Sequence, residues 1–134
     1  MSVNRSDVLP LQNETDIVYV RQAVRKLAQE LSFGLVDQTK IITAASELAR
    51  NVVKYAGCGA MRWEIVQADM KVGLRLCFED QGPGIADIEL AMRDGWTSAG
   101  GLGLGLSGSK RLVDDFEIVS TLGKGTRVTI TRWK

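Results

Sequence analysis

The chain has 134 residues, of which 45% are hydrophobic and 25% are charged, and its formal net charge is +1. This composition is that of one ordinary globular domain, without the excess of basic residues typical of nucleic-acid binding. No apolar run approaches the roughly 20 residues of a membrane span, and the first residues carry no signal-peptide core. We therefore expect a cytoplasmic protein that binds neither a membrane nor a nucleic acid. The sequence contains no histidine, which excludes a histidine-dependent triad and autophosphorylation on histidine.

The first two predicted elements are a strand and a helix. Residues 3–11 alternate loosely and include Pro10, which cannot donate a ladder hydrogen bond, so they predict an edge strand at most. Apolar residues at helical spacing predict an amphipathic helix over 14–32, with Asn13 as its N-cap and Gly34 closing it. We expect this helix to be structural.

A second helix is predicted from a cap at Asp37 to about Ala56, before Gly57 and Gly59 end it. At about 100° per residue its apolar side chains share one side, and the opposite side carries four polar residues: Glu47, Arg50, Asn51 and Lys54. From the helix alone, a solvated face is the simpler interpretation. A potential base, a neutral oxygen ligand and two cations would also suit a metal-bound polyphosphate.

Two runs with period-2 character, 61–67 and 71–79, predict a hairpin with one side on the core. It leads into the turn Asp80-Gln81-Gly82-Pro83-Gly84, where the proline and the glycines end the strand. A plain β-turn would explain these residues. A carboxylate fixed beside closely approachable backbone could instead accept a hydrogen bond from an adenine amino group.

The next segment is rich in glycine. Residues 86–94 predict a short helix, and the segment of about 86–104 between two glycine-rich stretches predicts a lid. The stretch GGLGLGLSG from Gly100 to Gly108, followed by a helix over about 104–114, predicts a phosphate-binding nest rather than a flexible loop. A dinucleotide-binding fold is disfavoured because no strand precedes the stretch, and Gly108-Ser109-Lys110 breaks the order of a P-loop.

A closing hairpin is predicted from apolar residues at 116–119 and 128–130 around a turn at 122–125. The element order is then (β)ααββ(α)αββ. Adjacent strand pairs imply a mixed, mostly antiparallel sheet with helices on one face. The expected fold class is α+β, a two-layer α/β sandwich, in a single domain over residues 1–134.

Four motifs stand in the order and approximate spacing found in the GHKL ATP-binding superfamily, which includes gyrase, Hsp90, histidine kinases and MutL. They are Glu47-Leu48-Ala49-Arg50-Asn51, Asp80-x-Gly82-x-Gly84, Gly101-x-Gly103-x-Gly105 and Gly125-Thr126. Each motif is weak alone, but all four in one short chain are a strong signal. The chain resembles this superfamily over residues 47–126, and the resemblance implies its Bergerat fold.

Within the superfamily, gyrase, Hsp90 and MutL need further domains, and a histidine kinase needs a phosphoacceptor histidine. The stretches SELARNVVKYAG, FEDQGPGI and GGLGLGLSGSKRLVDDFEI resemble the stand-alone serine/threonine kinases related to anti-sigma factors, above all the switch kinases of bacterial stressosomes. The resemblance implies ATP and Mg²⁺ as cofactors and STAS-domain scaffold and antagonist proteins as substrates. It also implies that the released kinase binds and activates a PP2C-type phosphatase in stress signalling, upstream of a sigma factor or another output.

The resemblance also implies roles for single residues. Glu47 would be the general base for an incoming hydroxyl, and Asn51 would bind ATP and ligate Mg²⁺ four residues further along the same helical face. Asp80 would bind the adenine amino group, helped through water by Thr126. The other ATP-binding residues would be Lys54, Gly82, Gly84, Gly101, Leu102, Gly103, Leu104 and Gly105.

Two other interpretations remain open. In a nucleotide-gated binding module, similar to an anti-sigma factor or a phosphatase activator, ATP would only shape a docking surface. That module would use every nucleotide-binding residue of the kinase, and the two interpretations differ in whether Glu47 is needed as a base. A detached histidine-kinase catalytic domain would instead produce acid-labile phosphohistidine on another protein.

Overall fold

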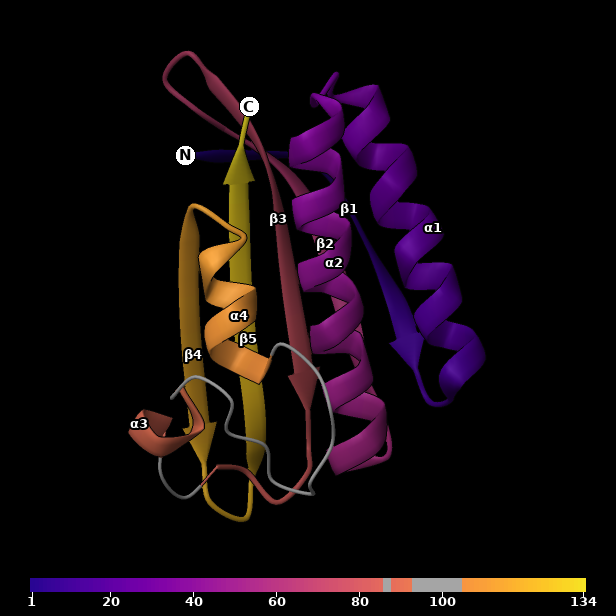
Figure 1. Ribbon diagram of the computed structural model, residues 1–134, viewed down its shortest axis with the longest axis vertical. Helices are drawn as coiled ribbons and strands as arrows, with labels where there is room; N and C mark the ends of the chain where they lie inside the picture. Colours follow the sequence, from indigo (N-terminus) through magenta and orange to yellow (C-terminus); the bar gives the residue numbers. More distant parts are fainter. Residues whose placement is uncertain (86–87, 93–104) are drawn as a thin grey trace.

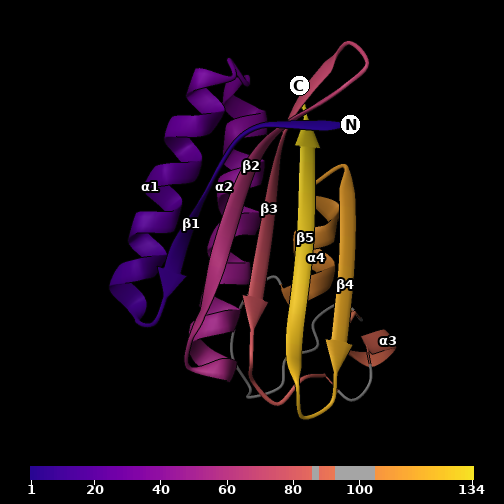
Figure 2. The ribbon, with the colours of Figure 1, turned by 180° about the vertical axis from the view of Figure 1, so that it is seen from behind.

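The computed structural model describes residues 1–85, 88–92 and 105–134. The elements in chain order are β1 (Ser2–Leu11), α1 (Glu14–Glu30), α2 (Leu35–Asn51), the π turn η1 (Val52–Ala56), β2 (Gly59–Ala68), β3 (Lys71–Asp80), α3 (Ile88–Ala91), α4 (Gly105–Arg111), β4 (Asp115–Thr121) and β5 (Gly125–Trp133). The strands form one five-stranded sheet in the order β1-β2-β3-β5-β4. Helices α1, α2 and α4 cover one face of this sheet (Figure 1), and Figure 2 shows the opposite face.

The predicted two-layer α+β sandwich is confirmed, and the described ladders are all antiparallel rather than mixed. β1 is an edge strand, as Pro10 indicated, and among the described strands it pairs only with β2. Both predicted hairpins are present. The β2–β3 hairpin turns at Asp69, which adopts the left-handed conformation with φ of 55°.

The core lies between the sheet and the helices. Opposite residues of an antiparallel pair point to the same face, so the pairs Met61–Phe78 and Phe78–Val128 place three strands' apolar side chains in one layer. The largest fully buried side chains of the chain include Leu11, Ile41, Leu48, Met61, Leu74, Leu76, Phe78 and Ile130. Within the described segments, no helix combines the length and the apolar character needed to cross a membrane.

The ends of α1 follow the sequence only in part. Asn13 caps the helix as predicted, because its side chain accepts the N–H of Asp16 at 3.0 Å. The residue that closes the helix is Ser32, with φ of 60°, and not Gly34. Gly34 is instead the N-cap residue of α2.

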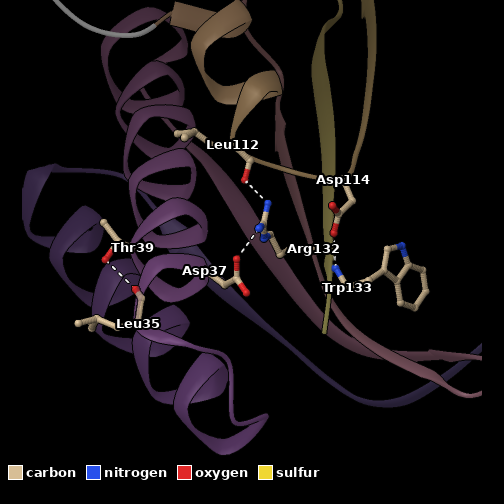
Figure 3. Close-up of polar contacts among 7 residues, drawn as sticks. All are labelled: Leu35, Asp37, Thr39, Leu112, Asp114, Arg132 and Trp133. Atoms are coloured by element: carbon tan, nitrogen blue, oxygen red, sulfur yellow. Dashed lines mark hydrogen bonds and ion pairs between the residues drawn. The ribbon is translucent and has the colours of Figure 1, made fainter.

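Arg132 of β5 joins α2 to the end of α4 (Figure 3). Its Nη2 donates to the carboxylate of Asp37 in the first turn of α2, and its Nη1 donates to the carbonyl oxygen of Leu112 at 3.1 Å. Asp37 therefore does not cap α2, which corrects the prediction, because its carboxylate pairs with Arg132. The N–H of Trp133 donates to Asp114 Oδ2 at 2.7 Å. These contacts fix the C-terminal end of α4, the helix that follows the glycine-rich stretch.

The predicted second helix reaches Ala56, but its last five residues form a π turn that ends at Gly57, with φ of 83°. A π turn closes i to i+5 hydrogen bonds, so its residues no longer advance by about 100° each. The direction of Lys54 relative to Glu47 therefore differs from that on a regular helical wheel. Single π turns occur often at functional sites.

α4 ends earlier than the sequence predicted. α4 begins at Gly105 as the sequence indicated but ends at Arg111, because the N–H of Leu112 bonds to the carbonyl oxygen of Ser109 at 3.1 Å. Of the predicted lid, α3 is described, whereas residues 86–87 and 93–104 lie outside the described part of the chain.

Candidate functional site

One end of the molecule gathers those predicted site residues that the structure describes. The C-terminal ends of α2 and β3, the β4–β5 turn and the N-terminal end of α4 all lie there (Figure 1). Antiparallel pairing explains part of this arrangement, because β5 begins beside the residue where β3 ends. Motifs that lie far apart in the sequence thus reach the same edge of the sheet.

At this edge, three apolar rows that face the helices each end in a polar residue. Asp80 follows Phe78 on β3, Thr126 precedes Val128 on β5, and Ser120 follows Ile118 on β4. Side chains two residues apart share one face of a strand, so the three polar side chains lie on the helix side of the sheet. These three half-buried side chains, Asp80, Ser120 and Thr126, border the core and are called the polar margin below.

Asp80 is the centre of this margin. Its Oδ1 accepts the N–H of Gly82 at 2.9 Å and the N–H of Thr126 at 3.3 Å. These two bonds fix the carboxylate to its own turn and to the start of β5. Both bonds use the same oxygen, and within residues 1–85, 88–92 and 105–134 no hydrogen bond engages Oδ2.

The two glycines of the Asp80 turn are needed for different reasons. A Cβ at Gly82 would lie 2.7 Å from the Cβ of Ala56 and 3.1 Å from Asp80 Oδ1, so this position needs space. Gly84 has φ of +78°, and a Cβ there would lie 2.4 Å from the carbonyl oxygen of Thr121. The sequence predicted backbone freedom for both glycines, but only Gly84 uses a left-handed conformation.

Gly125 permits the closest approach in the site. Its φ is +122°, and a Cβ at this position would lie 2.1 Å from the carbonyl oxygen of Asp80. Gly125→Ala should therefore lower the free energy of unfolding by at least about 1 kcal/mol, measured by urea denaturation.

The matched control is Gly34→Ala. Gly34 has φ of −63°, and a Cβ there would meet no atom within 4 Å. Alanine is a poorer N-cap residue than glycine, but it also restricts the unfolded chain, and these opposing effects should leave a change smaller than about 1 kcal/mol. Equal stabilities of the two variants would show that the contact between Gly125 and Asp80 does not constrain the fold.

The last turns of α2 carry the predicted base and metal ligand. The Glu47 side chain is 17% exposed, and its Oε1 accepts a hydrogen bond from Arg50 Nη1 at 2.8 Å. Asn51, one turn further on, is half-buried and is the last residue of α2. Lys54 is exposed, and its Nζ lies 5.3 Å from the centre of the Tyr55 ring.

The π turn connects this helix end to the Asp80 turn. A Cβ at Gly59 would lie 2.6 Å from Val52 Cγ1 and 3.2 Å from Asp80 Cβ. Together with the contact between Gly82 and Ala56, this packing brings the helix of Glu47 and Asn51 against the strand end of Asp80.

Four predicted ATP-binding residues lie outside the described residues: Gly101, Leu102, Gly103 and Leu104. Gly105, the last residue of that motif, begins α4 with φ of 67°.

The donor set suits magnesium. Mg²⁺ is usually held by one or two protein oxygens together with substrate phosphates and water. The half-buried carboxamide of Asn51 at the end of α2 supplies one such oxygen beside the half-buried Glu47.

The sequence analysis missed Ser120 and the role of Gly59. Ser120 Oγ lies 2.8 Å from Thr126 Oγ1, so it belongs to the same polar margin. Its signal was present in the sequence, because a serine two residues after Ile118 interrupts an apolar period-2 row. Gly59 was predicted only to end a helix, whereas it also allows the π turn to pack closely.

Comparisons with known proteins agree with this geometry. Residues 36–134 match the model of the histidine kinase-, DNA gyrase B- and HSP90-like ATPases. The chain is 48% identical over 131 residues to the serine/threonine-protein kinase RsbT of Bacillus subtilis (strain 168), with 98% of each chain covered. It is 30% identical over 128 residues to the anti-sigma F factor of Caldanaerobacter subterraneus subsp. tengcongensis, covering 91% of this chain and 86% of the relative.

Solved structures share the fold. A Mycobacterium tuberculosis structure of RsbU and RsbW domains aligns with a TM-score of 0.64 at 19% identity; the alignment covers 96% of this chain but only 32% of that structure. The mycobacterial sensor histidine kinase MprB aligns with a TM-score of 0.57, also at 19% identity, covering 96% of this chain and 97% of that one. The family match over residues 36–134 spans every described site residue, and the chain therefore belongs to the family of histidine kinase-, DNA gyrase B- and HSP90-like ATPases.

Proposed function

We propose that this chain is a Mg²⁺- and ATP-dependent protein serine/threonine kinase that phosphorylates STAS-domain proteins and exchanges one protein partner for another. The observation that carries the proposal is the fixed carboxylate of Asp80, whose Oδ2 stays available beside the helix end that bears Glu47 and Asn51. The 48% sequence identity to a serine/threonine-protein kinase, over nearly the whole chain, supports the choice of reaction.

Asp80 would bind the base of the nucleotide. The two hydrogen bonds to Oδ1 hold the carboxylate in place, and its Oδ2 is an acceptor that suits the exocyclic amino group of adenine. The N–H of Thr126 donates to Asp80 Oδ1, which places Thr126 beside this carboxylate. The Thr126 hydroxyl would reach the base through a water molecule. The tight packing at Gly82 and Gly84 leaves backbone rather than side chains along this edge.

Glu47 would accept the proton of the incoming serine or threonine hydroxyl. The Arg50 contact uses Oε1, and no hydrogen bond from the described residues engages Oε2, which can take the proton. Asn51 would hold Mg²⁺ through its side-chain oxygen, and the ion would neutralise phosphate charge. The amides of Gly101, Gly103 and Gly105, and the ammonium of Lys54, would bind the phosphates. Phosphoryl transfer depends mainly on positioning and charge stabilisation, so this set is sufficient.

The partners follow from the resemblance to stressosome switch kinases. A phosphate adds about −1.5 to −2 charges to a packed interface, so a phosphorylated STAS-domain partner would release the kinase. The released kinase would then bind and activate a PP2C-type phosphatase in the cytoplasm.

A second candidate function is a nucleotide-gated binding module with little transfer. Its support is the 30% identity to an anti-sigma F factor along most of the chain. Both functions need Asp80 and Asn51, and only transfer needs Glu47 as a base.

The experiment that tests the proposal is intact-mass spectrometry of a STAS-domain protein after incubation with this chain, ATP and Mg²⁺. The expected result is the mass of one added phosphate that is stable to acid, and none when EDTA is present. No added phosphate, with ATP binding demonstrated by calorimetry, would favour the binding module. An acid-labile phosphate would indicate phosphohistidine and overturn the proposed acceptor.

A further inference from the structure

Ser120 makes three hydrogen bonds at the polar margin of the sheet. Its Oγ accepts the N–H of Ile85 at 2.7 Å, lies 2.8 Å from Thr126 Oγ1, and donates to the carbonyl oxygen of Gly125 at 3.2 Å. The side chain is half-buried on β4, behind Thr126 as seen from Asp80 in the strand order β3-β5-β4. It therefore reaches the site through Thr126.

The protons available on Ser120 and on its three bonding partners fix the direction of each of these hydrogen bonds. The Ile85 N–H can only donate and the Gly125 carbonyl can only accept, so the single proton of Ser120 goes to Gly125. The short contact between the two hydroxyls then requires Thr126 to donate to Ser120. This arrangement is the one that satisfies all three contacts of Ser120 at once.

The consequence concerns the free side of Thr126. Having given its proton to Ser120, the Thr126 hydroxyl offers only lone pairs toward the nucleotide. The neighbouring Asp80 Oδ2 also offers only lone pairs. Both groups suit a base or a bridging water that donates a proton, and both oppose a base that presents an acceptor in the same place.

We propose that Ser120 is a positioning residue that gives this site selectivity for 6-amino over 6-oxo purine nucleotides by holding the Thr126 hydroxyl as an acceptor. The inference rests on the proposed binding of the base at Asp80 and Thr126. Ser120 touches no ligand itself. Without its oxygen, Thr126 regains a proton that it can donate to a purine O6 or to a water bound there.

The test compares ATP with inosine triphosphate, which carries the 6-oxo group and lacks the 6-amino group. Dissociation constants of both nucleotides are measured by calorimetry, with Mg²⁺ present, for the wild type, Ser120→Ala, Thr126→Val and the double variant. We expect Ser120→Ala to reduce the preference for ATP over inosine triphosphate by roughly fivefold or more. The Ser120→Ala change should leave the preference unaltered when Thr126 is already valine, because the residue acts through that hydroxyl.

Two further variants serve as controls. Thr129→Val removes a half-buried hydroxyl from the opposite face of β5, and it should leave the preference at the wild-type value. Ser120→Cys keeps the shape of the side chain, with a somewhat larger sulfur that is a weaker hydrogen-bonding atom than the oxygen. It should show a preference between those of the wild type and Ser120→Ala, and it decides the question if the alanine variant does not fold.

The outcomes separate this inference from the proposed function. If Ser120→Ala and Ser120→Cys weaken the binding of ATP and of inosine triphosphate equally, Ser120 has a purely structural role and the inference is overturned. A wild type that binds ATP but does not prefer it would overturn the inference and leave the proposed function intact. A wild type that binds neither nucleotide would overturn both.

Discussion

Glu47→Gln should slow phosphate transfer by about 10²- to 10⁴-fold and leave the affinity for ATP nearly unchanged. Glutamine has the size of glutamate, and its amide oxygen can still accept the hydrogen bond that Arg50 Nη1 donates at 2.8 Å. It cannot accept the proton of the incoming hydroxyl. The measurement is the single-turnover rate of phosphoprotein formation by mass spectrometry, together with the ATP dissociation constant by calorimetry.

Glu117→Gln is the matched control. Glu117 is exposed on β4 and alternates with the core-facing residues of that strand, so its rate and affinity should equal those of the wild type. Glu47→Ala should lose transfer as fully as Glu47→Gln. Wild-type transfer by both Glu47 variants would show that another group accepts the proton, and a large loss of ATP affinity would show that Glu47 acts in binding.

The strands and the two hairpin pairings were predictable from the sequence because their signals are local, whereas the pairings of β1 with β2 and of β3 with β5 were not predicted. The β3 sequence places Leu74, Leu76 and Phe78 on one face, and Pro10 excludes a central position for β1. The ends of the helices were less predictable. Ser32 takes the left-handed position that the sequence assigned to Gly34, since packing decides which residue ends the turn.

The candidate site divides in the same way. Asp80 and Thr126 could be named from the sequence because they belong to short motifs, although their roles remain proposals. The need for space at Gly82 arises from Ala56, 26 positions earlier, and the π turn that brings Ala56 there has no helical periodicity to reveal it. The bond from Ile85 to Ser120 and the partner of Asp37 likewise depend on contacts between residues far apart in the sequence.

Asp80→Asn should weaken ATP binding by about 10- to 100-fold without unfolding the protein. The carboxylate oxygen Oδ1 accepts both backbone N–H groups, from Gly82 at 2.9 Å and from Thr126 at 3.3 Å. An asparagine oxygen can take over both bonds, so the turn and the start of β5 should keep their positions. The amide nitrogen then replaces Oδ2, and a donor faces the adenine amino group where an ionised acceptor stood.

The matched control is Asp69→Asn, at the left-handed position of the β2–β3 turn, where asparagine is tolerated as well as aspartate. Its charge change equals that of Asp80→Asn, so any nonspecific effect of losing one negative charge on ATP binding appears in both variants. Calorimetry gives the two dissociation constants, and thermal denaturation checks that both variants fold. If Asp80→Asn binds ATP as tightly as Asp69→Asn, the base does not lie against this carboxylate. If the affinity of Asp80→Asn for ATP falls only because part of the protein is unfolded, as a lower melting temperature would show, the carboxylate stabilises the turn and does not recognise adenine.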